Sequence, residues 1–150
     1  MVDRLEETIS NFDLLDEWED RYRYIIELGR DLDPLPEADH NESNKVRGCA
    51  SQVWITSDLE STADGPILTF RGDSDALIVK GLIAIAFMLF SGKTATEILE
   101  TDAHAALKRI GLSEHLTPQR SNGFASMIER IKKDAYVALQ ASSSAAIPGR

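Results

Sequence analysis

Apolar residues recur at helical spacing in the N-terminal third of the chain. Residues 2–12 are expected to form a short helix, because its apolar positions lie three or four residues apart: Leu5, Ile9 and Phe12. A second helix is expected to start near Asp16, where Asp16 and Glu19 fit the capping-box pattern. Pro34 prevents its extension, so residues 31–43 are predicted to form a polar loop.

The pattern changes to strand type in the middle of the chain. Residues 52–57 and 67–71 are rich in good strand formers, and Asp64-Gly65-Pro66 between them is typical of a turn. The two runs therefore predict an antiparallel hairpin. Residues 45–47 are expected to add a short third strand at an edge of the sheet.

Residues 76–90 are apolar on nearly every face, which predicts a central helix covered by other elements. Ser74 or Asp73 is the expected cap of this helix. Further helices are expected to start at Thr94, which forms a capping-box pattern with Glu97, and at Asp102.

Thr117 and Pro118 indicate the start of the last helix, because proline is favoured at the first helical position. One face of this helix is apolar, with Phe124, Met127, Ile128, Ile131 and Ala135. Residues 141–150 are small and polar without periodicity, so they are expected to be a disordered tail. Together these elements predict one α+β domain over residues 1–140, with about three antiparallel strands covered by helices on one side.

Composition narrows the classes of partner. The chain has 150 residues and a formal net charge of −9, and we find no basic patch, so nucleic acid and anionic membrane are not expected as partners. The unbroken apolar run 82–90 is too short to cross a bilayer, and residues 1–10 lack a signal-peptide pattern. A single cysteine forms no internal disulfide and supplies no cysteine-based metal site without other ligands. We therefore expect a cytoplasmic protein without a metal.

Cys49 is the strongest nucleophile in the chain, and it lies outside the apolar periodic runs. Gly48 and Ala50 leave room for a partner to approach, and Lys45 and Arg47 are expected to lower the thiol pKa and favour the reactive thiolate. From these residues alone, two interpretations stay open: a reactive thiol, or an ordinary loop cysteine.

Four blocks of the sequence together resemble the SufE family of sulfur-acceptor proteins. The first block, Arg47-Gly48-Cys49-Ala50-Ser51-Gln52-Val53-Trp54, is similar to the family's cysteine loop, and the other blocks fall within residues 18–29, 72–84 and 115–128 in family order. The resemblance covers about residues 12–139. Ala50 departs from the family pattern, where a polar residue such as glutamine is expected, but a small residue preserves access.

The resemblance implies an SufE/IscU-like fold and a function in sulfur transfer. A pyridoxal-phosphate-dependent cysteine desulfurase, SufS- or CsdA-like, would donate sulfur to Cys49 as a persulfide and be stimulated, and the sulfur would pass to an iron–sulfur scaffold. The acceptor itself needs no cofactor. The resemblance also makes Arg120, Asp75, Gly48 and Arg47 candidates for binding the partner or positioning the cysteine loop. Arg120 is otherwise a surface arginine, and Asp75 otherwise caps the central helix.

Other functions are weighed against this one. A thiol peroxidase or a Cys–His hydrolase would use the same cysteine, but there is no second cysteine to resolve a sulfenic acid, and none of His40, His104 and His115 lies in a hydrolase signature. A cluster scaffold needs more ligands than one cysteine. A purely regulatory module that binds a desulfurase without carrying sulfur is a further alternative.

Overall fold

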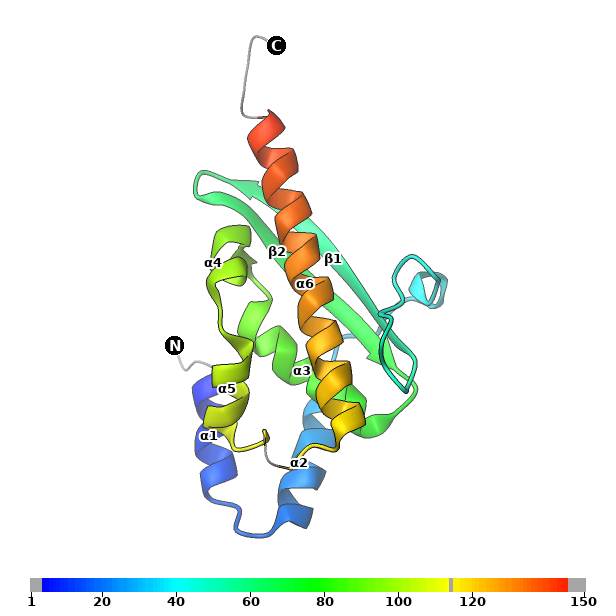
Figure 1. Ribbon diagram of the computed structural model, residues 1–150, viewed down its shortest axis with the longest axis vertical. Helices are drawn as coiled ribbons and strands as arrows, with labels where there is room; N and C mark the ends of the chain where they lie inside the picture. Colours follow the sequence, from blue (N-terminus) through cyan, green and yellow to red (C-terminus); the bar gives the residue numbers. More distant parts are fainter. Residues whose placement is uncertain (1–3, 114, 146–150) are drawn as a thin grey trace.

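The computed structural model describes residues 4–113 and 115–145, which form an α+β fold in which helices cover one face of a long, twisted hairpin (Figure 1). In chain order the elements are α1 (Arg4–Asp13), α2 (Trp18–Arg30), the 3₁₀ turn η1 (Glu37–Asp39), β1 (Val53–Thr62), β2 (Gly65–Ser74), α3 (Leu77–Phe90), β3 (Lys93–Thr94), α4 (Ala95–Glu100), α5 (Ala103–Ile110) and α6 (Pro118–Ala145). The predicted fold class is confirmed.

The sheet has three antiparallel strands in the order β1-β2-β3. The hairpin is longer than predicted, with Val53 opposite Ser74 at one end and Thr62 opposite Gly65 at the turn. The predicted third strand at residues 45–47 is wrong. Lys45 forms only an isolated bridge with Trp54, because the chain leaves the sheet at once to form the cysteine loop. The third strand is β3, which pairs with residues 67 and 68 of β2.

Helix α3 is the centre of the core, as its apolar sequence predicts, and it packs closely against α2. The close approach depends on glycine. A Cβ on Gly81 would overlap the Ile25 carbonyl of α2, and a Cβ on Gly29 would lie 2.6 Å from the Gly81 nitrogen. The backbone contact fixes α2 against the first half of α3, next to the cysteine loop.

Three predicted helix starts are confirmed. Thr94 and Glu97 form a complete capping box on α4, and the Asp102 carboxylate accepts a hydrogen bond from the Ala105 N–H on α5. The Thr117 hydroxyl accepts a hydrogen bond from the Arg120 N–H, so α6 begins at Pro118 as the sequence indicates.

Two predicted caps are wrong. Helix α2 begins at Trp18 behind Glu17, with no side-chain cap. Helix α3 begins at Leu77 behind Ala76, also without a side-chain cap, because Ser74 and Asp73 belong to β2 and bond to backbone N–H groups before the helix.

The last helix is longer than predicted. Helix α6 continues to Ala145, although the sequence suggested a disordered tail from residue 141. Residues 141–145 contain two alanines and no glycine or proline, and therefore nothing in them breaks a helix. Residues 146–150 lie outside the described part of the chain.

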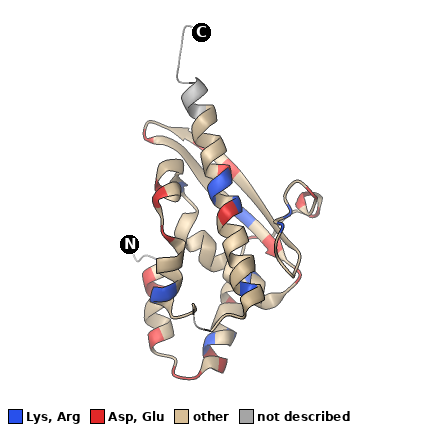
Figure 2. Ribbon diagram, in the orientation of Figure 1, with Lys and Arg blue, Asp and Glu red and all other residues tan. Residues whose placement is uncertain are grey.

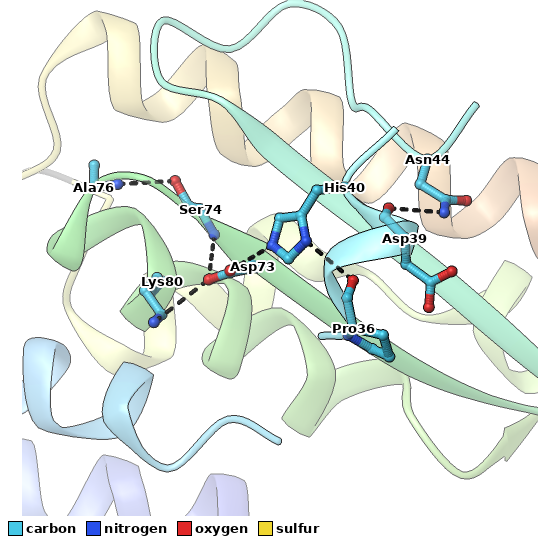
Figure 3. A network of polar contacts seen from close by, with 8 residues as sticks. All are labelled: Pro36, Asp39, His40, Asn44, Asp73, Ser74, Ala76 and Lys80. Atoms are coloured by element: carbon cyan, nitrogen blue, oxygen red, sulfur yellow. Dashed lines mark hydrogen bonds and ion pairs between the residues drawn. The ribbon is translucent and has the colours of Figure 1, made fainter. Parts of the chain in front are cut away.

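The polar loop between α2 and β1 is tied to the sheet through His40 (Figure 3). Its ring bonds to the Pro36 carbonyl at 3.1 Å and to the Asp73 carboxylate at 2.8 Å, and it lies edge-on against Trp54. Lys80 of α3 reaches the same carboxylate at 3.4 Å. One carboxylate on β2 therefore joins the loop, the sheet and the central helix.

Acidic and basic residues are interspersed over the helices and loops on the face shown in Figure 2. Within the described residues, no helix is long and apolar enough to cross a membrane, and no group of three or more His, Cys, Asp or Glu side chains is placed to hold a metal ion.

Candidate functional site

Cys49 lies in the loop that leads from the Lys45 bridge into β1, and it is half-buried. Its side chain lines a cavity of about 130 Å³, called here the Cys49 cavity. The wall is largely apolar and comes from the start of α3 and the start of α6: Ala76, Ile78, Val79, Leu82, Gln119, Arg120, Gly123 and Met127, with Ala50 and Ser51 from the loop. Two helices distant in sequence thus enclose the single cysteine.

Two glycines allow the cysteine loop to lie against α6. Gly48 has φ +89°, and a Cβ there would lie 2.5 Å from the Ser126 hydroxyl oxygen. Gly123 is buried under the cysteine, and a Cβ on it would lie 3.6 Å from the Cys49 sulfur. Gly48 is thus required for its conformation and for its closeness to α6, whereas its neighbours in the sequence suggested only room for a partner.

Burial raises the pKa of the Cys49 thiol above its ordinary value. The thiol donates a weak hydrogen bond to the Gly123 carbonyl at 3.6 Å. The prediction that Lys45 and Arg47 lower this pKa is wrong. The Arg47 guanidinium is exposed and pairs with Glu42 at 3.0 Å. The direction of the pKa shift at Cys49 is set by burial of the thiol. At rest the sulfur is therefore held as a neutral thiol.

Asp75 is exposed and braces the far end of the cysteine loop. Its carboxylate accepts a hydrogen bond from the Gln52 N–H at 3.1 Å, and its own N–H donates to the Gln52 carbonyl at 3.3 Å. Helix α3 has Ala76 as its N-cap residue and no side-chain cap. Of the two interpretations of Asp75, the geometry therefore favours anchoring the loop over capping the helix.

Arg120 is half-buried in the first turn of α6 and lines the Cys49 cavity. Its guanidinium donates a hydrogen bond to the Tyr22 hydroxyl of α2 at 3.2 Å and lies 5.6 Å from the centre of the Tyr22 ring. The surface-arginine interpretation is therefore too simple, because this side chain is held in place on the cavity wall.

The structure brings Cys49 and Arg120 together at the cavity and places Gly48 beside the cysteine, against Ser126 of α6. Asp75 lies at the end of the same loop, and Arg47 pairs with Glu42 away from the cavity. Sequence reasoning assigned no role to Gly123, Ser126 or Tyr22. Gly123 lay within a recognised block, and a glycine inside a helix is a signal of close approach. Tyr22 also lay within a recognised block, but at helical spacing it is interpreted as an ordinary core residue.

The three histidines lie away from the cysteine. His40 bonds to Asp73, His115 stacks on Trp18 with ring centres 4.2 Å apart, and His104 is exposed on α5. The described residues that line the Cys49 cavity include no histidine and no carboxylate. Within that wall, the only hydrogen-bond partner of the thiol is a backbone carbonyl.

Comparison with known proteins identifies the family. The family described as "SufE: Fe-S metabolism associated domain" matches residues 6–135. The chain belongs to the SufE family. This membership supports a role in sulfur transfer linked to iron–sulfur metabolism, as an accessory protein.

Two similar SufE-like proteins, both named as uncharacterized, come from Rhizobium species. The protein of Rhizobium meliloti is 54% identical over 131 residues, which cover 87% of this chain and 94% of the relative. The protein of Rhizobium etli is 50% identical over 133 residues, covering 89% and 90%. The SufE fold is also seen in the solution structure of a hypothetical protein from Thermus thermophilus, with a TM-score of 0.72 at 22% identity over 93% of this chain and 99% of that one.

Proposed function

We propose that this SufE-family chain accepts sulfur from a cysteine desulfurase as a persulfide on Cys49, stimulates that enzyme, and delivers the sulfur to iron–sulfur cluster assembly in the cytoplasm. The observation that carries the proposal is the Cys49 cavity. A lone cysteine, on a loop that bends through Gly48, faces a small and mostly apolar hollow between two helices.

The size and lining of the cavity suit a stored sulfur atom. A water molecule occupies about 30 Å³ in the liquid, so a hollow of about 130 Å³ has ample room for one added sulfur atom, which is of similar size. Ile78, Val79, Leu82 and Met127 surround that space with groups that neither reduce nor hydrolyse a persulfide. A persulfide turned inward would be kept from solvent thiols.

Transfer itself is thiol–disulfide-type exchange. The Cys49 thiol first loses its proton to solvent, and its thiolate attacks the outer sulfur of the persulfide on the desulfurase. One S–S bond forms at Cys49, the S–S bond on the partner breaks, and the electron pair leaves with the partner's sulfur as a thiolate. Because burial raises the pKa of the Cys49 thiol, extension of the loop into water on docking favours the thiolate that the reaction needs.

The alternatives use the cysteine differently. A Cys–His hydrolase or a thiol peroxidase activates its sulfur with a neighbouring base or cation, whereas the thiol here contacts a backbone carbonyl. A purely regulatory module would dock through the same loop without bonding sulfur. The geometry alone supports docking in both cases, and therefore the chemistry of Cys49 has to be measured.

Replacement of the single cysteine provides that test. Cys49→Ser keeps a similar volume, so the variant is expected to fold and to bind the desulfurase through a surface much larger than one side chain. The parent should gain the mass of one sulfur after incubation with desulfurase, cysteine and pyridoxal phosphate. The variant should gain none and should compete with the parent. Full stimulation of the desulfurase by Cys49→Ser would instead establish the regulatory module.

A further inference from the structure

Tyr22 holds Arg120 by two contacts from α2. The guanidinium donates to the hydroxyl at 3.2 Å and lies over the ring at 5.6 Å, within the range of a cation–π contact. One turn earlier on the same helix, the Trp18 ring stacks on His115, just before α6. Helix α2 is thus fixed against the start of α6, and Tyr22 presents a rigid platform to the arginine.

The charge of Arg120 is not neutralised by a carboxylate. Among the ion pairs of the described residues, none includes Arg120, although the chain has 25 acidic and 16 basic residues. Here the cation is held by a neutral tyrosine on the wall of the Cys49 cavity, where it is available to an anion that arrives later.

Sulfur transfer creates such an anion beside the cavity. Negative charge moves from the attacking Cys49 sulfur to the sulfur that leaves the desulfurase, and stabilising the leaving thiolate speeds the exchange. At rest Arg120 does not stabilise the Cys49 thiolate, because burial sets the direction of the pKa shift at that residue. Its charge is therefore left for the sulfur of the partner.

We propose that Tyr22 is a positioning residue: it holds the Arg120 guanidinium on the wall of the Cys49 cavity, where that charge stabilises the thiolate leaving the desulfurase. This inference rests on the proposed function, since it requires a sulfur donor that meets the extended Cys49 at the mouth of the cavity, within reach of Arg120. It assigns α2 a part in the chemistry, through its tyrosine, beside its part in the core.

The test is the rate of a single transfer from a persulfide-loaded desulfurase to Cys49, measured by rapid quenching and intact mass at saturating desulfurase. Tyr22→Phe loses the hydroxyl contact and should slow transfer by about three- to ten-fold, the effect of one hydrogen bond of ordinary strength. Tyr22→Leu also loses the ring and should slow it a further few-fold. Binding of each variant to the desulfurase should stay at the parent level.

A double-variant cycle separates positioning from structure. In an Arg120→Ala background, Tyr22→Leu should cause no further loss, because the tyrosine acts through the arginine. Tyr24→Phe is the matched control: its hydroxyl, on the same helix, accepts a hydrogen bond from Asn11 at 2.7 Å, and its transfer rate should equal that of the parent.

The outcomes distinguish this inference from the proposed function. If the parent takes no sulfur, the proposed function fails and Tyr22 has no reaction to assist. If the parent takes sulfur and Tyr22→Leu transfers at the same rate, the positioning role is overturned. It is also overturned if the losses from Tyr22→Leu and Arg120→Ala simply add, or if only binding weakens.

Discussion

The pKa of the Cys49 thiol is shifted in the direction opposite to that of an activated catalytic thiol. Reactive cysteines sit beside cations or helix N-termini, which lower their pKa. Here the loop buries the sulfur against the Gly123 carbonyl and the side chains of α3 and α6, which raises the pKa. A carrier benefits from this, because a resting thiol that stays neutral resists oxidants and stray electrophiles until a partner draws it out.

Alkylation of the single cysteine tests this environment. The rate of reaction with iodoacetamide follows the thiolate fraction, so the folded chain should show a pH midpoint above that of the chain unfolded in urea, whose thiol titrates near 8.5. The plateau rate at high pH reports access, and it should also be lower in the folded chain. A folded midpoint below the unfolded one would contradict the burial argument. Since the chain has one cysteine, the fraction of alkylated protein can be measured directly by intact mass.

At the scale of elements, the cysteine loop is a short span with an anchor at each end. Lys45 bridges to Trp54 before the loop, and Asp75 and Gln52 exchange hydrogen bonds after it. Between these anchors, Gly48 turns the chain with φ +89° against Ser126 of α6. The loop is therefore fixed at both ends, while its middle is held only by Gly48 against Ser126 and by the weak bond of the Cys49 thiol to Gly123. This arrangement allows Cys49 to swing outward without moving the sheet.

Substitution of that glycine should release the loop. Gly48→Ala places a methyl group 2.5 Å from the Ser126 hydroxyl oxygen and forces an L-residue into the left-handed region, at about 1–2 kcal/mol. We expect a lower free energy of unfolding and faster alkylation of Cys49, because the loop moves off α6. Adding Ser126→Gly should restore the stability lost through the clash with the Ser126 hydroxyl. The stability lost through the left-handed backbone at residue 48 should remain lost.

Gly65→Ala is the matched control, because Gly65 has φ +111° with nothing within 4 Å of its Cβ position and lies at the far end of the hairpin. It should lower stability without changing the alkylation rate. Equal alkylation rates in Gly48→Ala and the parent would show that the contact with Ser126 does not hold the loop.

The elements also show which features of the structure can be predicted from the sequence. Local signals were reliable where one side chain meets its own helix, as with Thr94, Asp102 and Thr117. They failed where a long-range contact determines the local structure. The Asp75 carboxylate accepts a hydrogen bond from Gln52, and Lys45 forms an isolated bridge with Trp54. Cys49 was singled out by the family resemblance, because its neighbours alone left two interpretations open and their predicted effect on the thiol pKa is wrong. Tyr22 was missed because its contact with Arg120 spans 98 positions, and no local pattern records such a pair.

For the molecule as a whole, the Asp73 carboxylate connects parts that are far apart in sequence. It joins His40 of the loop before the cysteine and Lys80 of α3, and it lies at the end of β2 that leads to Asp75 (Figure 3). The side-chain hydrogen bond to Asp73 raises the pKa of His40. Burial opposes ionisation of Asp73, yet its bonds to His40, the Ser74 N–H and Lys80 leave the pKa of this carboxyl lowered.

These two shifts predict how stability depends on pH. The raised pKa of His40 gives a contribution that is complete below about 6.5, its value when unfolded, and is lost as pH rises through the folded value. The lowered pKa of Asp73 gives a contribution that is present above about 3.9 and is lost as pH falls. The network should therefore stabilise the fold most between these limits, in mildly acidic solution.

The measurement is the melting temperature of the parent and of His40→Gln across pH 5 to 8. The difference between the two melting temperatures should be widest near pH 5 to 6 and should narrow toward pH 8. His104→Gln, at an exposed histidine of α5, should follow the parent at every pH. A gap that widens toward alkaline pH would mean that neutral His40 carries the contact, and that the loop before Cys49 is not held by an ion pair.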